Sequence, residues 1–131
     1  MAWPKSPFFK LSDKMHKAKL LVIHCIDLRF QVAIDEDVKK QVKYGEFDRI
    51  AWPGASIDFE NVKNASEVSL KLHNPNEIII YEHEDCGAYG QDNSLNTHKT
   101  NAQKLSSALK ASSPDLKISI KIATFKGIKE L

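Results

Sequence analysis

The sequence predicts an α/β fold in which a mostly parallel, four-stranded sheet lies between two layers of helices. Continuously apolar runs at residues 20–27 and 77–82 are typical of central strands that are covered on both faces. Strand-like and helix-like segments alternate along the chain, and the order βαβαβαβ favours parallel strands joined by right-handed helical crossovers. With 131 residues, the chain is expected to form a single domain over residues 1–131.

The two remaining strand candidates are expected at the edges of the sheet. Residues 48–52 form a short run, and residues 118–122 alternate isoleucine with polar side chains. Placing the continuously apolar runs in the centre gives the strand order 2-1-3-4. In this order the winding direction reverses between the first and third strands, and open α/β sheets bind ligands at the carboxyl ends of the strands beside such a switch point.

Three helix candidates are marked by apolar residues spaced three or four apart. The first is expected to stop at Gly45, and the second to begin after a capping Asp58 and to end at Asn74-Pro75. The third is expected to end before Pro114. The residues expected to face the core are Ile34, Val38 and Val42 in the first helix, Phe59, Val62, Ala65, Val68 and Leu72 in the second, and Ala102, Leu105 and Leu109 in the third.

Both cysteines of the chain lie at the ends of the two central strands. The first strand leads into C-x-D-x-R, residues 25–29, and the third leads into H-x-x-C-G, residues 83–87. If the first strand stays extended, its Cys, Asp and Arg share one face and His24 packs against a helix on the other. In the second motif, Gly87 is expected to permit a close backbone approach.

These motifs hold enough soft and borderline donors for one zinc ion. Two thiolates and one imidazole leave a fourth tetrahedral position, which catalytic sites keep for water or substrate. Asp27 is the one further candidate for that position within the motifs. Alternatively, it accepts a hydrogen bond from bound water while Arg29 holds it ionised through a bidentate pair.

The combination of C-x-D-x-R with H-x-x-C-G resembles the β-class carbonic anhydrases over roughly residues 20–87. The resemblance implies that Cys25, His83 and Cys86 hold Zn²⁺, with Asp27 and Arg29 as a gatekeeping catalytic dyad. It also implies reversible hydration of carbon dioxide to bicarbonate by a metal-bound hydroxide.

The resemblance extends to the pocket and the assembly. Gly54 falls where the family has a Gly-containing turn beside the active site, so Gly54 and Gly87 are expected in the substrate pocket. Members of the family are dimers or multiples of dimers, which implies a homodimer or a higher homo-oligomer here.

Other interpretations of the same residues stay open. Zinc can be structural, with Asp27 as a permanent fourth ligand. The chain can then be a structural or regulatory zinc protein, or it can hydrolyse another small linear substrate such as carbon disulfide or carbonyl sulfide. A Cys25–Cys86 redox switch is a third interpretation, and two buried cysteines without a metal are a fourth.

The sequence also predicts the surroundings of several other histidine, acidic and aromatic residues. His16, His73 and His98 are expected at the solvated surface, with His98 also a candidate proton relay. Glu82, Glu84 and Asp85 are expected to be loop charges, of which one can orient His83. Tyr89 is expected to line the pocket or to cover the sheet edge, and Trp3, Phe8 and Phe9 to pack onto the domain or to form a dimer contact.

Composition excludes several classes of partner. A net charge of +2 with scattered lysines argues against nucleic acid, and the longest apolar run is too short to span a bilayer. The start of the chain lacks the pattern of a secretory signal. Two cysteines do not make a disulfide scaffold, so a cytoplasmic location is expected.

Overall fold

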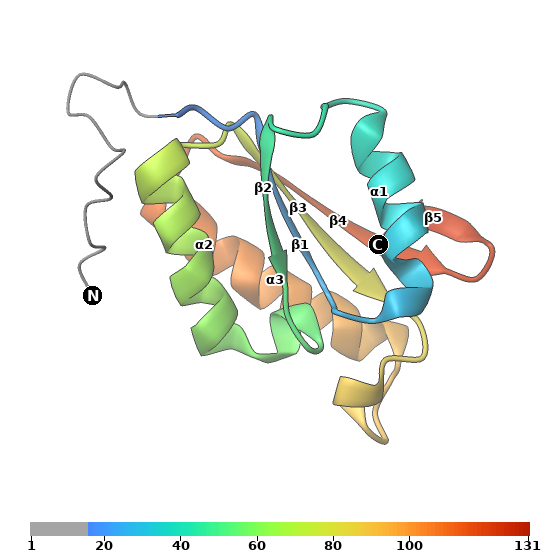
Figure 1. Cartoon of the computed structure of the whole chain (residues 1–131). Helices are drawn as coiled ribbons and strands as arrows, with labels where there is room; N and C mark the ends of the chain where they lie inside the picture. The colour runs from blue at the N-terminus through green and yellow to red at the C-terminus, as the bar shows by residue number, and fades with distance from the viewer. Residues whose placement is uncertain (1–15) are drawn as a thin grey trace, which may run out of the picture.

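In the computed structural model, which describes residues 16–131, five strands form one sheet in the order β2-β1-β3-β4-β5 (Figure 1). The first four strands are parallel, and β5 pairs antiparallel with β4. The strands are β1 (Leu20–His24), β2 (Phe47–Ala51), β3 (Glu77–His83), β4 (Lys117–Thr124) and β5 (Gly127–Glu130). The helices are α1 (Gln31–Lys39), α2 (Phe59–His73) and α3 (Leu95–Ser112), and 3-10 turns η1 (Leu28–Phe30), η2 (Ala55–Ile57) and η3 (Gly87–Tyr89) follow β1, β2 and β3.

The predicted α/β class and the parallel order 2-1-3-4 are confirmed, but the sheet has a fifth strand. Strand β5 pairs with residues 121–124, so β4 is not the edge strand that the sequence predicts. A two-residue turn joins the strands, and Gly127 adopts a φ of +132° directly after it. Within β5, Ile128 packs against the core beside α1. One apolar residue in a short strand leaves too little alternation to mark the strand in the sequence.

Helices cover both faces of the sheet, as predicted. Helix α1 lies on one face, and α2 and α3 lie on the other (Figure 1). Successive residues of β1 and β3 point to opposite faces, so each strand contributes to two apolar cores. The buried strand residues on the side of α2 and α3 are Leu21, Ile23, Ile78 and Ile80, and those on the side of α1 are Leu20, Val22, Ile79 and Tyr81.

The predicted core faces of α1 and α3 are confirmed, and that of α2 is partly wrong. All predicted core residues of the first and third helices are buried, namely Ile34, Val38, Val42, Ala102, Leu105 and Leu109. In α2, Val62 is buried, whereas Ala65 and Leu72 are exposed. Ser66 and Ser69 are buried there because their hydroxyls donate to the Val62 carbonyl and to Asp48. Satisfied hydroxyls therefore replace two of the expected apolar contacts.

Helix α2 begins and ends at the predicted residues. Asp58 is the N-cap residue, but its carboxylate accepts a hydrogen bond from Trp52 Nε1 at 2.7 Å instead of one from the helix backbone. This bond ties the end of β2 to the start of α2. Asn74 closes the helix in a left-handed conformation, with a φ of +44°.

The aromatic residues Trp3, Phe8 and Phe9 lie outside the described residues. None of the helices within residues 16–131 combines the length and the apolar character that crossing a bilayer requires.

A partly buried polar contact fixes α1 to the sheet. The Asp37 carboxylate of α1 accepts hydrogen bonds from Tyr81 of β3 at 2.6 Å and from Lys121 of β4 at 2.8 Å. Burial favours the neutral carboxyl, but the Lys121 ammonium and the Tyr81 hydroxyl outweigh it and lower the pKa of Asp37.

Asp37→Asn is expected to lower the free energy of unfolding at pH 7 by about 1–3 kcal/mol, because hydrogen bonds to a charged group are lost. The folded pKa lies below the unfolded value of about 3.9, so this stabilisation is present above about pH 4 and disappears as the pH falls through the folded pKa. Chemical denaturation at neutral and acidic pH measures the difference. The exposed Asp115→Asn is the control, and equal stability of both variants at pH 7 would contradict the role of Asp37.

Candidate metal centre

The first motif departs from extended geometry directly after β1. The strand ends at His24, and Asp27 is the N-cap residue of η1, where its Oδ1 accepts a hydrogen bond from the Arg29 backbone N–H at 2.9 Å. The prediction that residues 20–27 form one strand is therefore too long at its carboxyl end. An aspartate side chain that bonds the backbone two residues on competes with the sheet and turns the chain.

Three side chains that could bind a metal converge where β1 and β3 end. The Sγ atoms of Cys25 and Cys86 and a ring nitrogen of His83 lie within 4.8 Å of one another, and all three residues are buried. Cys25 directly follows β1, His83 is the last residue of β3, and Cys86 precedes η3. Within the described residues, this is the single group of three or more such side chains that can hold a metal ion.

The His83 ring is prepared to bind through one nitrogen. Its Nδ1 lies 2.7 Å from the Glu84 carbonyl, which can only accept, so Nδ1 carries the hydrogen. Its Nε2 is buried and has no hydrogen-bond partner among the described residues. Phe30 of η1 stacks on the ring at a centroid distance of 4.7 Å and holds its plane. A buried lone pair without a donor fits a metal ligand.

The two thiols differ in their ease of ionisation. Burial favours the neutral thiol of Cys25, but the neighbouring His83 and backbone N–H groups, including Gly54 N at 3.2 Å from Sγ, lower its pKa. Burial raises the pKa of Cys86, and the nearby Cys25 adds to this effect. The sulfurs are 3.9 Å apart and not joined by a disulfide. The donor set of two sulfurs and one imidazole suits Zn²⁺, which lowers the pKa of the thiols that it binds.

The pair of Asp27 and Arg29 lies at the edge of this cluster. Arg29 Nε donates to Asp27 Oδ1 at 3.0 Å and Nη2 donates to Oδ2 at 2.8 Å, which is the bidentate pair that the sequence predicts. These hydrogen bonds lower the pKa of Asp27 to about 2. Asp27 Oδ2 lies 3.9 Å from His83 Nε2. Arg29 therefore holds an ionised carboxylate beside the candidate ligand atom of His83.

Arg29 is itself held from three sides. Its Nη1 donates to the Asp85 carboxylate at 3.0 Å and its Nη2 to the Asp85 carbonyl at 2.9 Å. The guanidinium also lies 5.4 Å from the ring centroids of both Phe30 and Phe125. Phe125 belongs to the turn between β4 and β5, so the strand that the sequence did not predict helps to place Arg29. Asp85, expected to be a loop charge, is a second anchor for the same side chain.

The two glycines of the motifs differ in their surroundings. Gly54 is buried, has a φ of +72° and places its N–H against Cys25 Sγ. A Cβ there would overlap Ile57 Cγ2 and would lie 2.9 Å from Ala88 Cβ. At Gly87, by contrast, an added Cβ meets no atom of the described residues within 4 Å. The close backbone approach expected at Gly87 is thus found at Gly54.

Two residues expected at the surface or in a loop are buried in the structure. His98 is 1% exposed and Glu82 is 2% exposed, and His98 Nδ1 lies 2.7 Å from Glu82 Oε1. Tyr89 stacks on His98 at 3.7 Å between ring centroids and donates to Glu82 at 2.7 Å. Tyr89 therefore packs inward. The sequence holds a signal for this cluster, because His98 lies on the same helical stripe as the buried Ala102 and Leu105.

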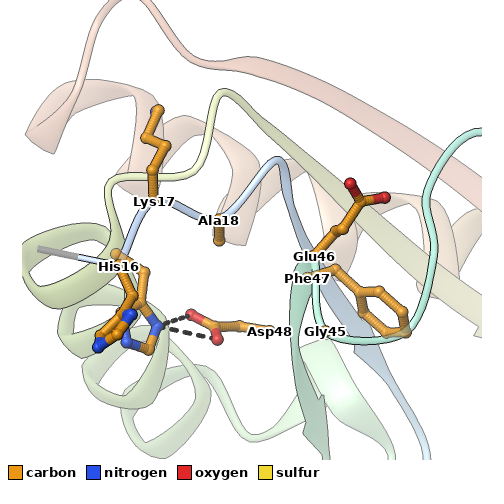
Figure 2. A pocket seen from close by; sticks show the side chains of 8 residues that line it. His16, Lys17, Ala18, Gly45, Glu46, Phe47 and Asp48 are labelled. Atoms are coloured by element: carbon orange, nitrogen blue, oxygen red, sulfur yellow. Dashed lines mark hydrogen bonds and ion pairs between the residues drawn. The ribbon is translucent and has the colours of Figure 1, made fainter.

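The remaining histidines lie away from the cluster or face another side. His24 is buried with its Nδ1 2.7 Å from the Cys25 carbonyl. His16 is exposed, as predicted, whereas His73 is half-buried and bonds Asp48 at 2.7 Å. Figure 2 shows His16 and Asp48 beside a cavity of about 80 Å³ near the amino ends of β1 and β2. This cavity lies at the opposite end of the strands from Cys25 and His83.

Residues 15–123 match the family described as "Putative carbonic anhydrase". The chain belongs to this carbonic anhydrase family. An uncharacterised protein of Rickettsia conorii is 28% identical over 136 residues, which cover 88% of this chain and 73% of that protein. A second uncharacterised protein, from Rickettsia bellii, is 31% identical over 84 residues, which cover 57% of this chain and 51% of that protein.

Solved structures of β-carbonic anhydrases share the fold of this family member. The enzyme CafA of Aspergillus fumigatus superposes with a TM-score of 0.60 at 14% identity, covering 88% of this chain and 76% of the enzyme. A tetrameric enzyme of Sordaria macrospora superposes with a TM-score of 0.62 at 14% identity, covering 88% of this chain and 81% of that enzyme. The β-carbonic anhydrase isoform I of Trichomonas vaginalis superposes with a TM-score of 0.60 at 15% identity, covering 95% of this chain and 87% of that enzyme. The chain therefore has the β-carbonic anhydrase fold with a highly divergent sequence.

Gly54→Ala is expected to destabilise this carbonic anhydrase family member by about 2–5 kcal/mol, because a positive φ and a steric overlap both oppose the added methyl group. Gly45→Ala is the matched control. Gly45 has a φ of +89°, but an added Cβ meets no atom of the described residues within 4 Å, so we expect a loss of only about 1–2 kcal/mol. Chemical denaturation of the metal-free proteins compares the two, and equal losses would mean that the overlap is relieved without cost.

Proposed function

We propose that this protein catalyses the zinc-dependent, reversible hydration of carbon dioxide to bicarbonate. The observation that carries the proposal is the convergence of two cysteine sulfurs and the partnerless His83 Nε2 within 4.8 Å, beside a carboxylate held by an arginine. Membership of the carbonic anhydrase family and the β-carbonic anhydrase fold support the same reaction. In this proposal the whole chain forms one zinc domain.

Each residue of the centre has a definite task in this proposal. Cys25, His83 and Cys86 hold Zn²⁺. When bound, zinc acts as a Lewis acid that makes water a nucleophile near neutral pH. The buried His83 Nδ1–H bond to a backbone carbonyl keeps Nε2 directed at the metal. Gly54 contributes an N–H to the Cys25 sulfur, and Gly54 and Gly87 form part of the substrate pocket.

Asp27 serves as a hydrogen-bond acceptor and not as an acid. Arg29 lowers its pKa to about 2, so the carboxylate is ionised at neutral pH. Arg29 also engages both of its oxygens, which favours a position beside the metal over direct ligation as a fourth ligand. From that position, Asp27 orients the proton of the reacting water and leaves the fourth coordination position accessible.

The assembly and the location of the protein are part of the same proposal. We infer a homodimer or a higher homo-oligomer, since the enzyme of Sordaria macrospora is tetrameric. Three apolar side chains beside the site, those of Ile26, Leu28 and Val32, are between 52% and 83% exposed, which also fits burial in an assembly. We further infer a cytoplasmic location, where the two thiols stay reduced.

The zinc-loaded protein is expected to accelerate carbon dioxide hydration in a stopped-flow assay with a pH indicator. Cys86→Ala is the control, and we expect it to lose both the metal and the activity because one of three protein ligands is missing. Metal content is measured on the same samples. A loaded wild-type protein with no rate above buffer would favour a zinc protein without hydratase activity, and a metal-free Cys86→Ala protein that retains the rate would exclude the proposed centre.

Asp27→Asn is expected to keep zinc and to lower the turnover about 100-fold, because the neutral amide is a weaker acceptor and its NH2 group replaces one of the two oxygens that Arg29 holds. Asp115→Asn, at an exposed position in the turn before β4, should leave turnover unchanged. Steady-state rates at equal metal content provide the comparison. Normal turnover of the Asp27→Asn protein would refute the proposed role of the carboxylate.

A further inference from the structure

A chain of buried polar residues leads from α3 to the metal-binding loop. Glu82 of β3 accepts hydrogen bonds from Ser56 at 2.7 Å and from Tyr89 at 2.7 Å, and His98 Nδ1 lies 2.7 Å from its Oε1. The side chains of Glu82 and His98 are each 1% exposed. Such a carboxylate is costly to bury unless its hydrogen bonds are satisfied, and here three side chains surround it.

Asn93 connects this cluster to Cys86. Its Oδ1 accepts a hydrogen bond from the Cys86 backbone N–H at 3.1 Å, and its Nδ2 donates to the Cys86 carbonyl at 2.9 Å. The peptide groups of Cys86 fix the orientation of the Asn93 amide. If the amide were reversed, its NH2 group would face the Cys86 N–H and its oxygen would face the Cys86 carbonyl, and neither hydrogen bond could form. The amide oxygen therefore also faces His98 Nε2, at 3.1 Å.

The same geometry fixes one hydrogen of His98. Nε2 faces the Asn93 amide oxygen, which can only accept, so Nε2 carries a hydrogen and donates it to that oxygen. Nδ1 is hydrogen-bonded to Glu82 Oε1 at 2.7 Å. His98 thus holds the Asn93 oxygen in place and is itself held by Glu82.

The loop that carries Cys86 needs such support. Asp85, the residue before it, adopts a φ of +55°, which costs a non-glycine residue about 1 kcal/mol or more. The Asn93 amide bonds both the N–H and the carbonyl of Cys86, so it fixes the peptide groups on both sides of its Cα. This is the geometry of a brace that decides where the Cys86 sulfur lies relative to Cys25 and His83.

We propose that Asn93, held by the His98–Glu82 pair, is a positioning residue that keeps the Cys86 sulfur in place for metal binding. This inference rests on the proposed zinc site. It assigns a function to three residues that touch neither the metal nor the substrate, and it explains why Glu82 and His98 are buried next to the metal-binding loop.

The test is the zinc affinity of Asn93→Ala, measured by competition with a chromophoric chelator at pH 7.5. We expect the affinity to fall about 10- to 100-fold, the usual effect of losing a group that orients a ligand. Asn101→Ala is the matched control, since Asn101 lies on α3 and donates to Tyr89 at 3.4 Å. Its affinity should equal that of the wild type. Circular dichroism and thermal unfolding of the metal-free proteins establish that each variant is folded.

Asn93→Asp provides a second variant that keeps an oxygen for Cys86 N–H and His98 and replaces the donor to the Cys86 carbonyl by a second, negatively charged acceptor. A fall in affinity is expected here as well, and it decides the test if Asn93→Ala does not fold. Wild-type affinity in a folded Asn93 variant would overturn the inference. Failure of the wild-type protein to bind zinc would instead overturn the proposed function.

Nitrogen NMR of the wild-type protein labelled at histidine gives a readout that a merely structural role would not move. We expect Nε2 of the His98 ring, assigned by its disappearance in His98→Gln, to carry a hydrogen. In Asn93→Ala this ring should lose the hydrogen bond at Nε2, with a shift of that nitrogen alone. A wild-type His98 without a hydrogen on Nε2 would contradict the proposed support of Asn93.

Discussion

The parallel pairing of β1 with β3 is the constraint on which the proposed metal centre depends. The register joins Leu20 to Glu77 and Ile23 to Ile80, so the carboxyl ends of the two strands lie side by side. That pairing brings together two motifs that are about sixty residues apart in the chain. The short turns that follow each strand then bend Cys25 and Cys86 toward His83, within 4.8 Å. A shift of this register would separate the donors.

Electrostatics at the centre is organised in two layers. In the outer layer, Arg29 keeps the Asp27 carboxylate ionised and is anchored by Asp85 and by the ring of Phe125. In the inner layer, the buried pair of Glu82 and His98 supports the loop of Cys86 through an amide. Each layer is assembled from segments that are distant in sequence. The site therefore depends on α3 and on the turn between β4 and β5 as well as on the strands that carry the ligands.

Much of this arrangement can be predicted from the sequence because the strongest signals are local. The runs at residues 20–27 and 77–82 identify the central strands, and the spacing of Ala102, Leu105 and Leu109 identifies α3. The convergence of Cys25, His83 and Cys86 follows from two motifs at strand ends. The edges of these elements are less predictable, since the Asp27 side chain ends the extended segment by bonding a backbone N–H.

The parts that the sequence does not reveal depend on tertiary contacts. The serines of α2 are buried because Asp48 and a backbone carbonyl accept hydrogen bonds from their hydroxyls. The sequence around the serines does not indicate these partners. His98 appears polar in isolation, yet Glu82 and Asn93 supply a complete set of partners for it in the core. Strand β5 forms because β4 offers a free edge, and its own four residues carry little pattern. A polar residue on an otherwise apolar helical stripe is thus the most useful sequence signal of a buried polar contact in such chains.

X-ray absorption at the zinc edge tests the central claim most directly. Protein loaded with one equivalent of zinc should show two sulfur neighbours at about 2.3 Å and nitrogen or oxygen neighbours at about 2.0–2.1 Å. Because the chain has two cysteines, two sulfur neighbours require Cys25 and Cys86 to meet on one ion, and a nitrogen neighbour is what His83 supplies. A spectrum without sulfur neighbours, or protein that takes up no stoichiometric zinc, would contradict the account.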